Sequence, residues 1–464
     1  MEMSGGGNHI VMSKTQELNK TDMLNGPIWN KVPLFALPVA ATAILEQLFN
    51  ASDLAVVGNF TTGDHTVAVA AVGANSPIIG LVLNLFIGIA LGANVVIANA
   101  IGRDDRDTVH RAVHTAILMA LTGGVLAALV GEAVAGWLLG LLNVPADVLP
   151  YAELYLRIYL LGLPVIFLYN FEAAIFRSVG DTKVPLMALT FSGILNVVLN
   201  LFFVIVLKMT VNGVAIATVI SNAVSSAILF YRLTKTDTYI RVDPKALRFD
   251  GLSLRKVLQI GLPAGIQSAV FAVANIVIQA AINSLGTVVI AASSAAFNLE
   301  IIAYYMMNSF SQACTTFVGQ NYGARQLDRC RRVFRICLLE DALASGLCIG
   351  VILTFGRVLL GLFTSDPQVV EIGYIRLVTV FFAYIFSMLY EVMSSYLRGF
   401  GISLAPALLT MFGVCGTRLA WVYLVFPHSR TFQTIMLVYP ISLSFTALLI
   451  FGALVWYRPT RRLG

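Results

Sequence analysis

Long apolar runs dominate the sequence and restrict it to one class of fold. A helix needs about 18 or more mostly apolar residues to cross the hydrocarbon core of a bilayer. Runs of that kind lie near residues 31–58, 66–101, 108–130, 150–177, 184–207, 213–233, 255–285, 287–321, 330–356, 368–398, 403–426 and 433–457. With 58% hydrophobic and 12% charged residues, the chain is also too apolar for a soluble domain. The sequence therefore predicts an all-α integral membrane protein with twelve transmembrane helices.

Basic residues gather in alternate connections between these runs. The basic set contains Arg103, Arg106, Arg111, Arg177, Lys183, Arg232, Lys235, Arg241, Lys245, Arg248, Arg255, Lys256, Arg325, Arg329, Arg331, Arg332, Arg335, Arg398, Arg458, Arg461 and Arg462. Opposite connections such as NFTTGDHT, KMTVNG and NSLGT hold few. Because Lys and Arg are retained on the cytoplasmic side, we expect a multi-pass plasma membrane protein with both termini in the cytoplasm. The formal net charge of +6 then reflects these loops, and we expect no nucleic-acid partner.

The two halves of the chain resemble each other. ALPVA around Pro38 resembles GLPAG around Pro263, and IGRDDRDTVHR (101–111) resembles YGARQLDRCRR (322–332). Tyr155, Arg157 and Glu172 match Tyr374, Arg376 and Glu391, while Arg177, Gly180 and Pro185 match Arg398, Gly401 and Pro406. With six helices in each half, both halves enter the membrane from the same side, so the repeats are parallel.

The domain organisation follows from this duplication. We expect a disordered cytoplasmic tail over 1–27, a six-helix lobe over 28–233, a cytoplasmic linker over 234–254 and a second six-helix lobe over 255–464. The tail is polar with a GGG run and has no apolar segment of a signal peptide. The five cysteines form no CxxC pair and the five histidines no metal-binding spacing, so we expect no disulfide framework, metal enzyme or cofactor.

Several motifs, taken in order, resemble one known family. They are N-x-x-D-x-x-x-x-G (Asn50, Asp53, Gly58) ending the first helix, the IGRDD turn, FRSVGDTKVP after the fourth helix, GVAIATVIS at the sixth and GQNYGA after the eighth. Together with the twelve helices, this order is similar to that of the multidrug and toxic compound extrusion (MATE) family, from about residue 26 onward. The resemblance implies a V-shaped pair of lobes that exports cationic amphipathic compounds in exchange for Na⁺ or H⁺.

The resemblance also implies an ion site in the first lobe. The acid on the family's first helix matches Asp53, and its partners on the fifth and sixth helices match Asn196, Asn200 and Thr218. Some members carry Asp where Asn200 stands, so this cluster has one carboxylate fewer than a two-acid site. At 1.5 Å per residue, Asp53 lies roughly 33 Å from Lys31 and Asn200 roughly 25 Å from Lys183, so the four side chains can meet in the outer half of this lobe.

Chemistry alone leaves the coupling ion open. A carboxylate inside hydrocarbon is costly and normally faces a bundle interior or a wet cavity. Asp53 with amide and hydroxyl oxygens suits either a proton carrier or a weak Na⁺ site, the alternative being a structural hydrogen-bond acceptor. Glu46 shares a helical face with Asn50 and Asp53, and it is either a relay or substrate counter-charge or a carboxyl kept neutral by burial.

The second lobe offers further candidates. Glu300 lies near the middle of its predicted helix, and Glu391 is the nearest match to a second-lobe acid known in other branches of the family. An Arg-paired carboxylate is the alternative for Glu391. Polar residues on the seventh and eighth helices are expected to line a pocket for a flat cation, or else to bond between helices: Asn275, Gln279, Tyr304, Asn308 and Gln312.

The sequence therefore predicts a secondary active exporter, a monomer in the lipid bilayer that carries small cationic molecules. A flippase for a lipid-linked sugar has a similar number of helices, but it should have a strongly cationic central cavity, and few Lys or Arg lie within these runs. An intramembrane enzyme is the third reading. We expect no enzyme, because neither HExxH nor GxSxG nor a paired Asp-rich motif is present.

Overall fold

The computed structural model describes residues 21–61, 64–142 and 144–462, and helices dominate this part of the chain. Eleven helices are long and apolar enough to cross a membrane, and a pair bent by 50°, α5 and α6, makes the twelfth span. The bend falls at Gly162, two residues before Pro164, where proline cannot continue the hydrogen-bond ladder. The prediction of twelve transmembrane helices is confirmed.

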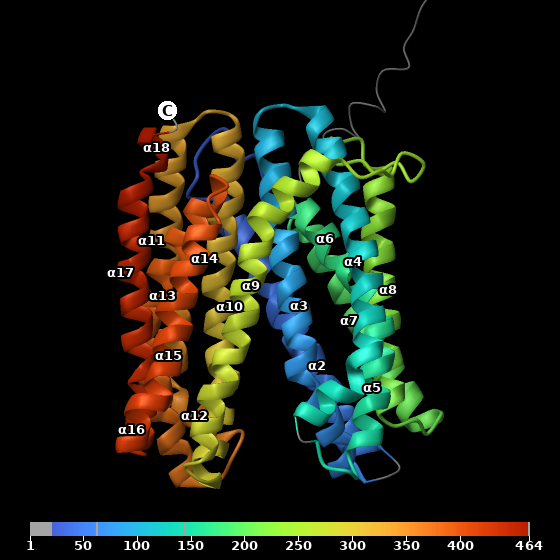
Figure 1. Ribbon diagram of the computed structural model, residues 1–464, viewed down its shortest axis with the longest axis vertical. Coiled ribbons are helices and arrows are strands. Elements are labelled where there is room, and N and C mark those ends of the chain that lie inside the picture. The colour runs from blue at the N-terminus through green and yellow to red at the C-terminus, as the bar shows by residue number, and fades with distance from the viewer. Residues whose placement is uncertain (1–20, 62–63, 143, 463–464) are drawn as a thin grey trace, which may run out of the picture.

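The first lobe contains the spans up to residue 235. Its elements are α2 (Lys31–Phe60), α3 (His65–Gly102), α4 (Arg106–Leu141), α5 (Leu149–Leu161), α6 (Leu163–Ser178), α7 (Lys183–Leu201), which continues into the π-helix η1 (Phe202–Val206), and α8 (Val211–Lys235). Figure 1 shows these helices on the right, in blue to green.

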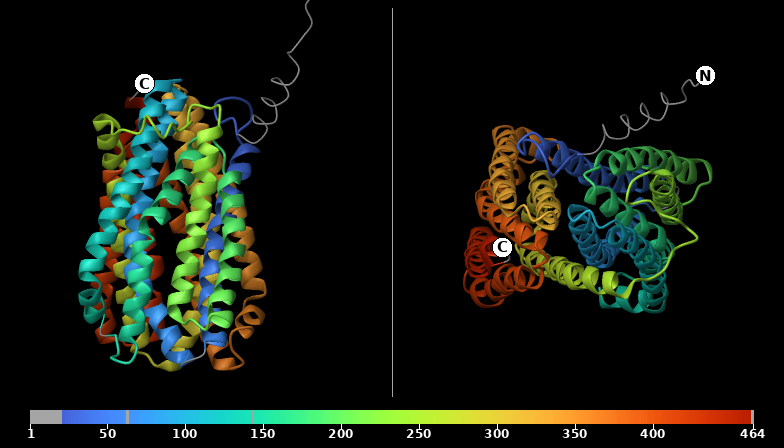
Figure 2. Two further views of the ribbon diagram at one scale, coloured as in Figure 1. Left: turned by 90° about the vertical axis from the view of Figure 1, so that its right-hand side faces the viewer. Right: turned by 90° about the horizontal axis from the view of Figure 1, so that it is seen from above.

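The second lobe contains the remaining spans. Its elements are α9 (Gly251–Asn283), α10 (Thr287–Gly323), α11 (Leu327–Thr354), α12 (Gly356–Gly361), α13 (Pro367–Gly399), α14 (Leu404–Thr410), η2 (Met411–Gly416), α15 (Thr417–Ala420), η3 (Trp421–Val425), η4 (Phe426–His428), α16 (Phe432–Met436), α17 (Val438–Tyr457) and α18 (Pro459–Arg462). The view from above shows the two lobes side by side (Figure 2, right). We call the upper end of Figure 1, where the C-terminus and the loops 103–105, 179–182, 236–250 and 324–326 lie, the basic end.

Unusual backbone angles support the internal repeat. Outside the helices of each half, Asp104 (φ 53°) corresponds to Arg325 (φ 58°), and Gly180 (φ 81°) corresponds to Gly401 (φ 83°). Both pairs are 221 residues apart, which is also the offset between segments 101–111 and 322–332 and between Arg177 and Arg398. A left-handed residue is rare for Asp and Arg, so two turns of the same shape at one offset are strong support for duplication.

The first helix of each lobe begins in the core of the other lobe. Val32, Phe35 and Val39 of α2 pack with Phe310 and Phe317 of α10. The Phe35 and Phe317 rings meet edge to face at 5.9 Å. Further along, Val56 and Val57 of α2 pack within the first lobe. The predicted boundaries at 28 and 255 therefore mark positions in the sequence, whereas at the basic end the beginning of α2 packs with helices of the other lobe.

The same exchange occurs in α9. Its Val257 lies in the core of the first lobe, whereas Ile278 and Ile282 pack with Phe426 and Ile435 of the second. Figure 1 shows α9 crossing diagonally from the right lobe to the left lobe. At the basic end, each lobe therefore contributes the beginning of its first helix to the core of the other lobe.

Glycines make the contact between the lobes very close. A Cβ on Gly92 of α3 would collide with the Val257 carbonyl and with Gly261, and one on Gly88 would collide with Gly265. On the other side, a Cβ on Gly102 would collide with the Gln320 carbonyl of α10. Because the colliding atoms are backbone atoms, they cannot rotate away, and only glycine permits this approach.

The linker is attached to the first lobe. The Asp243 amide donates to His114 Nε2 at 3.1 Å, and Ile240 and Val242 are buried. Asp250 caps α9 by accepting from the amide and hydroxyl of Ser253, and these bonds lower the pKa of its carboxyl.

The tail predicted over 1–27 needs a correction in its last part. Residues 1–20 lie outside the described residues, but residues 21–29, which we call the N-terminal strap, are packed at the basic end. The Thr21 amide donates to the Gly180 carbonyl at 3.3 Å in the first lobe. Arg329 of the second lobe donates to the carbonyls of Met23, Asn25 and Gly26 at 2.9–3.2 Å. The arginine satisfies backbone groups that a solvated tail would leave to water.

Candidate functional site

Asp53 and three polar side chains of the first lobe form a buried cluster. Asn200 Nδ2 of α7 donates to Asp53 Oδ1 at 2.6 Å, and the Thr218 hydroxyl of α8 is 3.1 Å from Asp53 Oδ2. Asn200 Nδ2 also donates to Asn196 Oδ1 at 3.1 Å, and Asn196 Nδ2 lies 3.4 Å from Thr218 Oγ1. All four residues are buried. The structure thus brings together the four side chains that the sequence placed at one depth.

The elements explain why the cluster assembles. Asn196 and Asn200 are one turn apart on α7, so their amides point to the same side. The contact of α7 with both α2 and α8 then brings Asp53 and Thr218 to that side. Just beyond Asn200 the helix widens into η1, and short π-helical segments occur frequently at functional sites.

The hydrogen-bond geometry accommodates two protonation states. The Thr218 hydroxyl lies 3.0 Å from the Val214 carbonyl as well as 3.1 Å from Asp53 Oδ2, and it has a single hydrogen. It can donate to an ionised Asp53. Alternatively, a protonated Asp53 can donate to Thr218 Oγ1, whose own hydrogen then goes to Val214. Either arrangement needs no movement of a heavy atom.

The cluster also has one unused acceptor. Asn200 Oδ1 is buried and has no hydrogen-bond partner among the described residues. Buried polar atoms are rarely left unsatisfied, because each costs about 1–3 kcal/mol. Within the part of the chain that the structure describes, no three His, Cys, Asp or Glu residues gather as a metal site. The available oxygens are therefore one carboxylate, two amides and one hydroxyl.

Glu46 and Asn50 continue the face of Asp53 but differ from it in exposure. Both are accessible on α2, whereas Asp53 is buried. The neighbouring Gln47 accepts a hydrogen bond from the Tyr305 hydroxyl of α10 at 3.4 Å, across the two lobes. Glu46 therefore lies beside the contact between the lobes.

The two second-lobe acids have different surroundings. Glu300 forms a bidentate ion pair with Arg376, with Nε–Oε1 at 2.7 Å and Nη2–Oε2 at 3.0 Å, and both side chains are 4% exposed. Both of its oxygens are therefore occupied. Glu391 is also buried, on α13, and no ion pair to it is found among the described residues.

The predicted pocket residues divide into two groups. On α10, Tyr304, Asn308 and Gln312 are partly accessible along one face. Gln312 Nε2 donates to Asn308 Oδ1 at 2.7 Å, and Arg177 of the first lobe donates to Gln312 Oε1 at 2.9 Å. On α9, by contrast, Asn275 accepts from Arg418 of α15, which is the bonding between helices named as the alternative. Gln279 does neither, because it donates to Asn283 on its own helix.

Sequence reasoning missed three arginines that are buried or half-buried. The sequence pattern groups Arg177 and Arg398 with the loops, but both lie in the last turns of helices, Arg177 half-buried and Arg398 buried. Arg398 Nη2 donates to Gln267 Oε1 at 2.7 Å. Arg418 lies within an apolar run and belongs to none of the predicted sites. It is 6% exposed and donates to Asn275 Oδ1 at 2.8 Å, with its guanidinium 4.9 Å from the centre of the Tyr439 ring. The cost of a charge in an apolar run, which identified Asp53, could have identified Arg418 as well.

Other bonds join the lobes along α10. The Thr316 hydroxyl donates to Asn94 Oδ1 at 3.0 Å, and Gln320 Nε2 donates to the Ser178 carbonyl at 2.7 Å. With Arg177 and Gln312, these bonds form a polar line from the middle of the molecule to the basic end. The geometry is that of a two-lobed membrane protein closed at this end.

Known proteins share this fold and sequence pattern. The MatE family model matches residues 38–202 and 263–424. A relative described as probable multidrug resistance protein YoeA, from Bacillus subtilis, is 25% identical over 454 residues, which are 95% of this chain and 96% of the relative. Probable multidrug resistance protein NorM from Thermotoga maritima is 27% identical over 83% of this chain and 82% of its own.

A solved structure agrees with the fold. The outward-facing conformation of a multidrug resistance MATE family transporter superposes with a TM-score of 0.87 at 21% identity, covering 96% of this chain and 99% of that one. The family model alone matches well over half of the sequence, in two segments that correspond to the two lobes. The chain therefore belongs to the MATE family of multidrug efflux transporters.

Proposed function

We propose that this transporter is an antiporter, in which Asp53 with Asn196, Asn200 and Thr218 binds the coupling ion, H⁺ or Na⁺. The observation that carries the proposal is the burial of Asp53 of α2 among polar partners from α7 and α8 within an apolar lobe. A lone carboxylate at this depth is costly to keep, so a role in transport explains it better than a structural role.

One feature of the cluster supports H⁺ and another supports Na⁺. A proton can bind Asp53 without rearrangement, because either the Thr218 hydroxyl or the protonated carboxyl can donate the hydrogen bond between them. Na⁺ would need oxygen ligands. A half-turn of the Asn200 amide supplies one, because it exchanges Nδ2 for the unpartnered Oδ1 beside Asp53. Ion binding then changes the charge and packing between α2, α7 and α8, and the ion acts by favouring one conformation over the other.

For the substrate we propose cationic amphipathic small molecules. The accessible carboxylate of Glu46 and the partly accessible ring of Tyr304 support this proposal, because a cation is attracted by both a carboxylate and the face of an aromatic ring. Relatives differ in what they are named for. A protein from Shewanella oneidensis that is 24% identical over 73% of this chain is described as an FAD transporter.

We further propose that the protein acts as a monomer in the plasma membrane with its basic end in the cytoplasm. Three of the four loops at that end (Figure 1) contain arginine or lysine, as the retention of positive charge predicts, namely Arg103, Arg241, Lys245, Arg248 and Arg325. The close contact of the lobes there then makes the described state closed to the cytoplasm.

Substituting Asp53 tests the ion site. In proteoliposomes that export ethidium as a fluorescent cation, Asp53→Asn should reduce gradient-driven efflux to the level seen without a gradient. Collapsing the Na⁺ and H⁺ gradients separately in the unmodified protein identifies the ion. Asp64→Asn is the matched control, because Asp64 caps α3 and Asn caps equally well.

Gradient-driven efflux by Asp53→Asn at the rate of the unmodified protein would reject the role of this carboxylate. Ethidium binding, measured by fluorescence polarisation in detergent, separates a defect in coupling from a loss of the folded state.

A further inference from the structure

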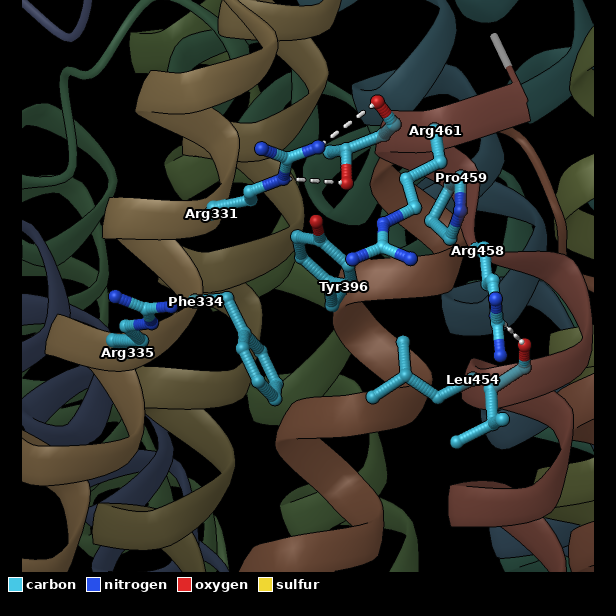
Figure 3. Close-up of a pocket in the computed structure, with 10 residues that line it drawn as sticks. Arg331, Phe334, Arg335, Tyr396, Leu454, Arg458, Pro459 and Arg461 are labelled. Atoms are coloured by element: carbon cyan, nitrogen blue, oxygen red, sulfur yellow. Dashed lines mark hydrogen bonds between the residues drawn. The ribbon is translucent and has the colours of Figure 1, made fainter.

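A basic pocket lies at the basic end of the second lobe, away from the ion site. It has a volume of about 400 Å³, within the range of small-ligand pockets. Its walls come from α11, the end of α13, the end of α17 and α18, and Figure 3 shows Arg335 and Arg458 on opposite sides of it. Four arginines line it, namely Arg331, Arg335, Arg458 and Arg461, and its lining contains no carboxylate.

The pocket is held in shape by its own contacts. Arg331 Nε donates to Thr460 Oγ1 at 2.8 Å and Nη2 to the Thr460 carbonyl at 3.2 Å, which ties α11 to α18. Arg458 has a left-handed backbone (φ 42°) that turns the chain from α17 into α18. At the base, the Phe334 and Tyr396 rings lie 4.8 Å apart. The site is therefore built by the fold rather than by a mobile loop.

Two of the arginines have unused donors. Among the described residues, the side chains of Arg335 and Arg461 make no hydrogen bond or ion pair, whereas Arg331 pairs with Asp328 at 3.0 Å. A guanidinium offers five N–H donors in a plane that matches two oxygens of a phosphate. The pocket therefore presents unpaired positive charge and free donors around an aromatic base.

Apolar stripes lead away from this pocket along the outside of the lobe. On α11, Leu339, Leu343 and Leu347 are 60%, 65% and 71% exposed, and they follow Arg335 at intervals of four residues, on the same helical face. On α17, Leu448 and Phe451 are 70% and 56% exposed. These surfaces belong to membrane-spanning helices, so lipid tails cover them.

We propose that this pocket binds the phosphate headgroup of an anionic phospholipid, whose acyl chains lie along the exposed stripes of α11 and α17. Charge complementarity selects an anion, and the continuity of the arginines with the lipid-facing stripes selects a lipid as its source. Basic pockets between membrane helices bind such headgroups. The bound lipid links α11 to α18 in the second lobe, independently of ion coupling.

Native mass spectrometry of the full-length protein tests the proposal, with phosphatidylglycerol as the anionic probe and phosphatidylcholine as the zwitterionic one. The test variant is Arg335→Gln/Arg461→Gln, which removes two charges and no contact of the described structure. The control variant Arg241→Gln/Lys245→Gln removes two exposed charges from the linker at the same end. We expect the test variant to bind phosphatidylglycerol roughly twenty-five-fold more weakly, about five-fold for each arginine.

The expected pattern has three further parts. The control variant binds phosphatidylglycerol as the unmodified protein does, phosphatidylcholine binds weakly to all three proteins, and the melting temperatures agree. Equal weakening in both variants would overturn the proposal, because the attraction would then be a general effect of charge. Binding of inorganic phosphate as tight as that of phosphatidylglycerol would also overturn it, because the acyl chains would then contribute nothing and the ligand would be a free anion.

Discussion

At the scale of single residues, the buried arginines of the second lobe show how a partner decides what a charge costs. Arg376 and Arg418 lie 5.7 and 4.9 Å from the centre of the same ring, that of Tyr439. Arg376 has a bidentate carboxylate partner in Glu300, while Arg418 donates to the neutral amide of Asn275. A buried pair whose partner is removed leaves an uncompensated charge. The two arginines should therefore respond differently to substitution.

We expect Arg376→Met to destabilise the protein by about 3–5 kcal/mol, because it leaves the Glu300 carboxylate buried without a partner. The double variant Arg376→Met/Glu300→Met should recover most of this loss, since no isolated charge remains. Arg418→Met is the comparison, and it should cost much less, because it removes a charge that has no counter-charge nearby. Melting temperatures in detergent measure the series. If Arg376→Met were as stable as the unmodified protein, the ion pair between Arg376 and Glu300 would not contribute to stability.

At the scale of elements, two glycines of α3 allow the contact between the lobes to be tested by substitution. A Cβ on Gly92 collides with backbone atoms of α9, whereas a Cβ on Gly80 of the same helix meets nothing within 4 Å. The two positions therefore separate the effect of alanine on the helix from its effect on the contact. Replacing glycine by alanine stabilises the helix itself by about 1 kcal/mol at either position.

Gly92→Ala should shift the protein toward a state that is open at the basic end, and Gly80→Ala should not. Spin labels at Lys183 of the first lobe and Arg332 of the second, both exposed, report the distance across that end. In a background without native cysteines, we expect a longer distance to appear in Gly92→Ala. Identical distance distributions for the two variants would show that the contact of α3 with α9 is not the closing surface.

The transmembrane spans and the cluster around Asp53 could be predicted from the sequence, whereas the packing of α2 and α9 could not. The twelve spans were predictable because hydrophobicity over about 20 residues is a local property. The cluster of Asp53, Asn196 and Asn200 was predictable because depth follows from rise per residue, combined with the family resemblance. The exchange of α2 and α9 between the lobes was not, since it depends on packing between distant segments. Arg398 was misplaced because its position in the last turn of α13 resembles a loop position in sequence.

At the scale of the whole molecule, three kinds of contact close the basic end. The beginnings of α2 and α9 lie in the opposite lobe, a polar line along α10 joins the lobes, and the N-terminal strap contacts both. A rocking motion that opens this end must break contacts of all three kinds. The strap differs from the others because it is not part of a membrane helix. It can therefore be weakened without changing the spans.

Weakening the strap should favour opening at the basic end. Arg329→Gln shortens the side chain that donates to the carbonyls of Met23, Asn25 and Gly26. Loss of these bonds weakens the attachment of the strap to the second lobe, where Asn321 Nδ2 still donates to the Met23 carbonyl at 3.1 Å. A typical hydrogen bond contributes about 1 kcal/mol, and bonds to a charged group contribute more. A shift of several kcal/mol is enough to change which of two states dominates. The distance between labels at Lys183 and Arg332 should therefore lengthen.

The control for this experiment is Lys235→Gln, which removes an equal charge at the same end. The Lys235 ammonium lies 6.0 Å from the centre of the Tyr231 ring of its own helix and bridges no lobes. If the strap holds the basic end closed, Arg329→Gln lengthens the distance between the two labels and also increases protease cleavage within residues 21–29. Lys235→Gln then changes neither. Increased cleavage without a change in distance would mean that the strap covers the closed end but does not hold it.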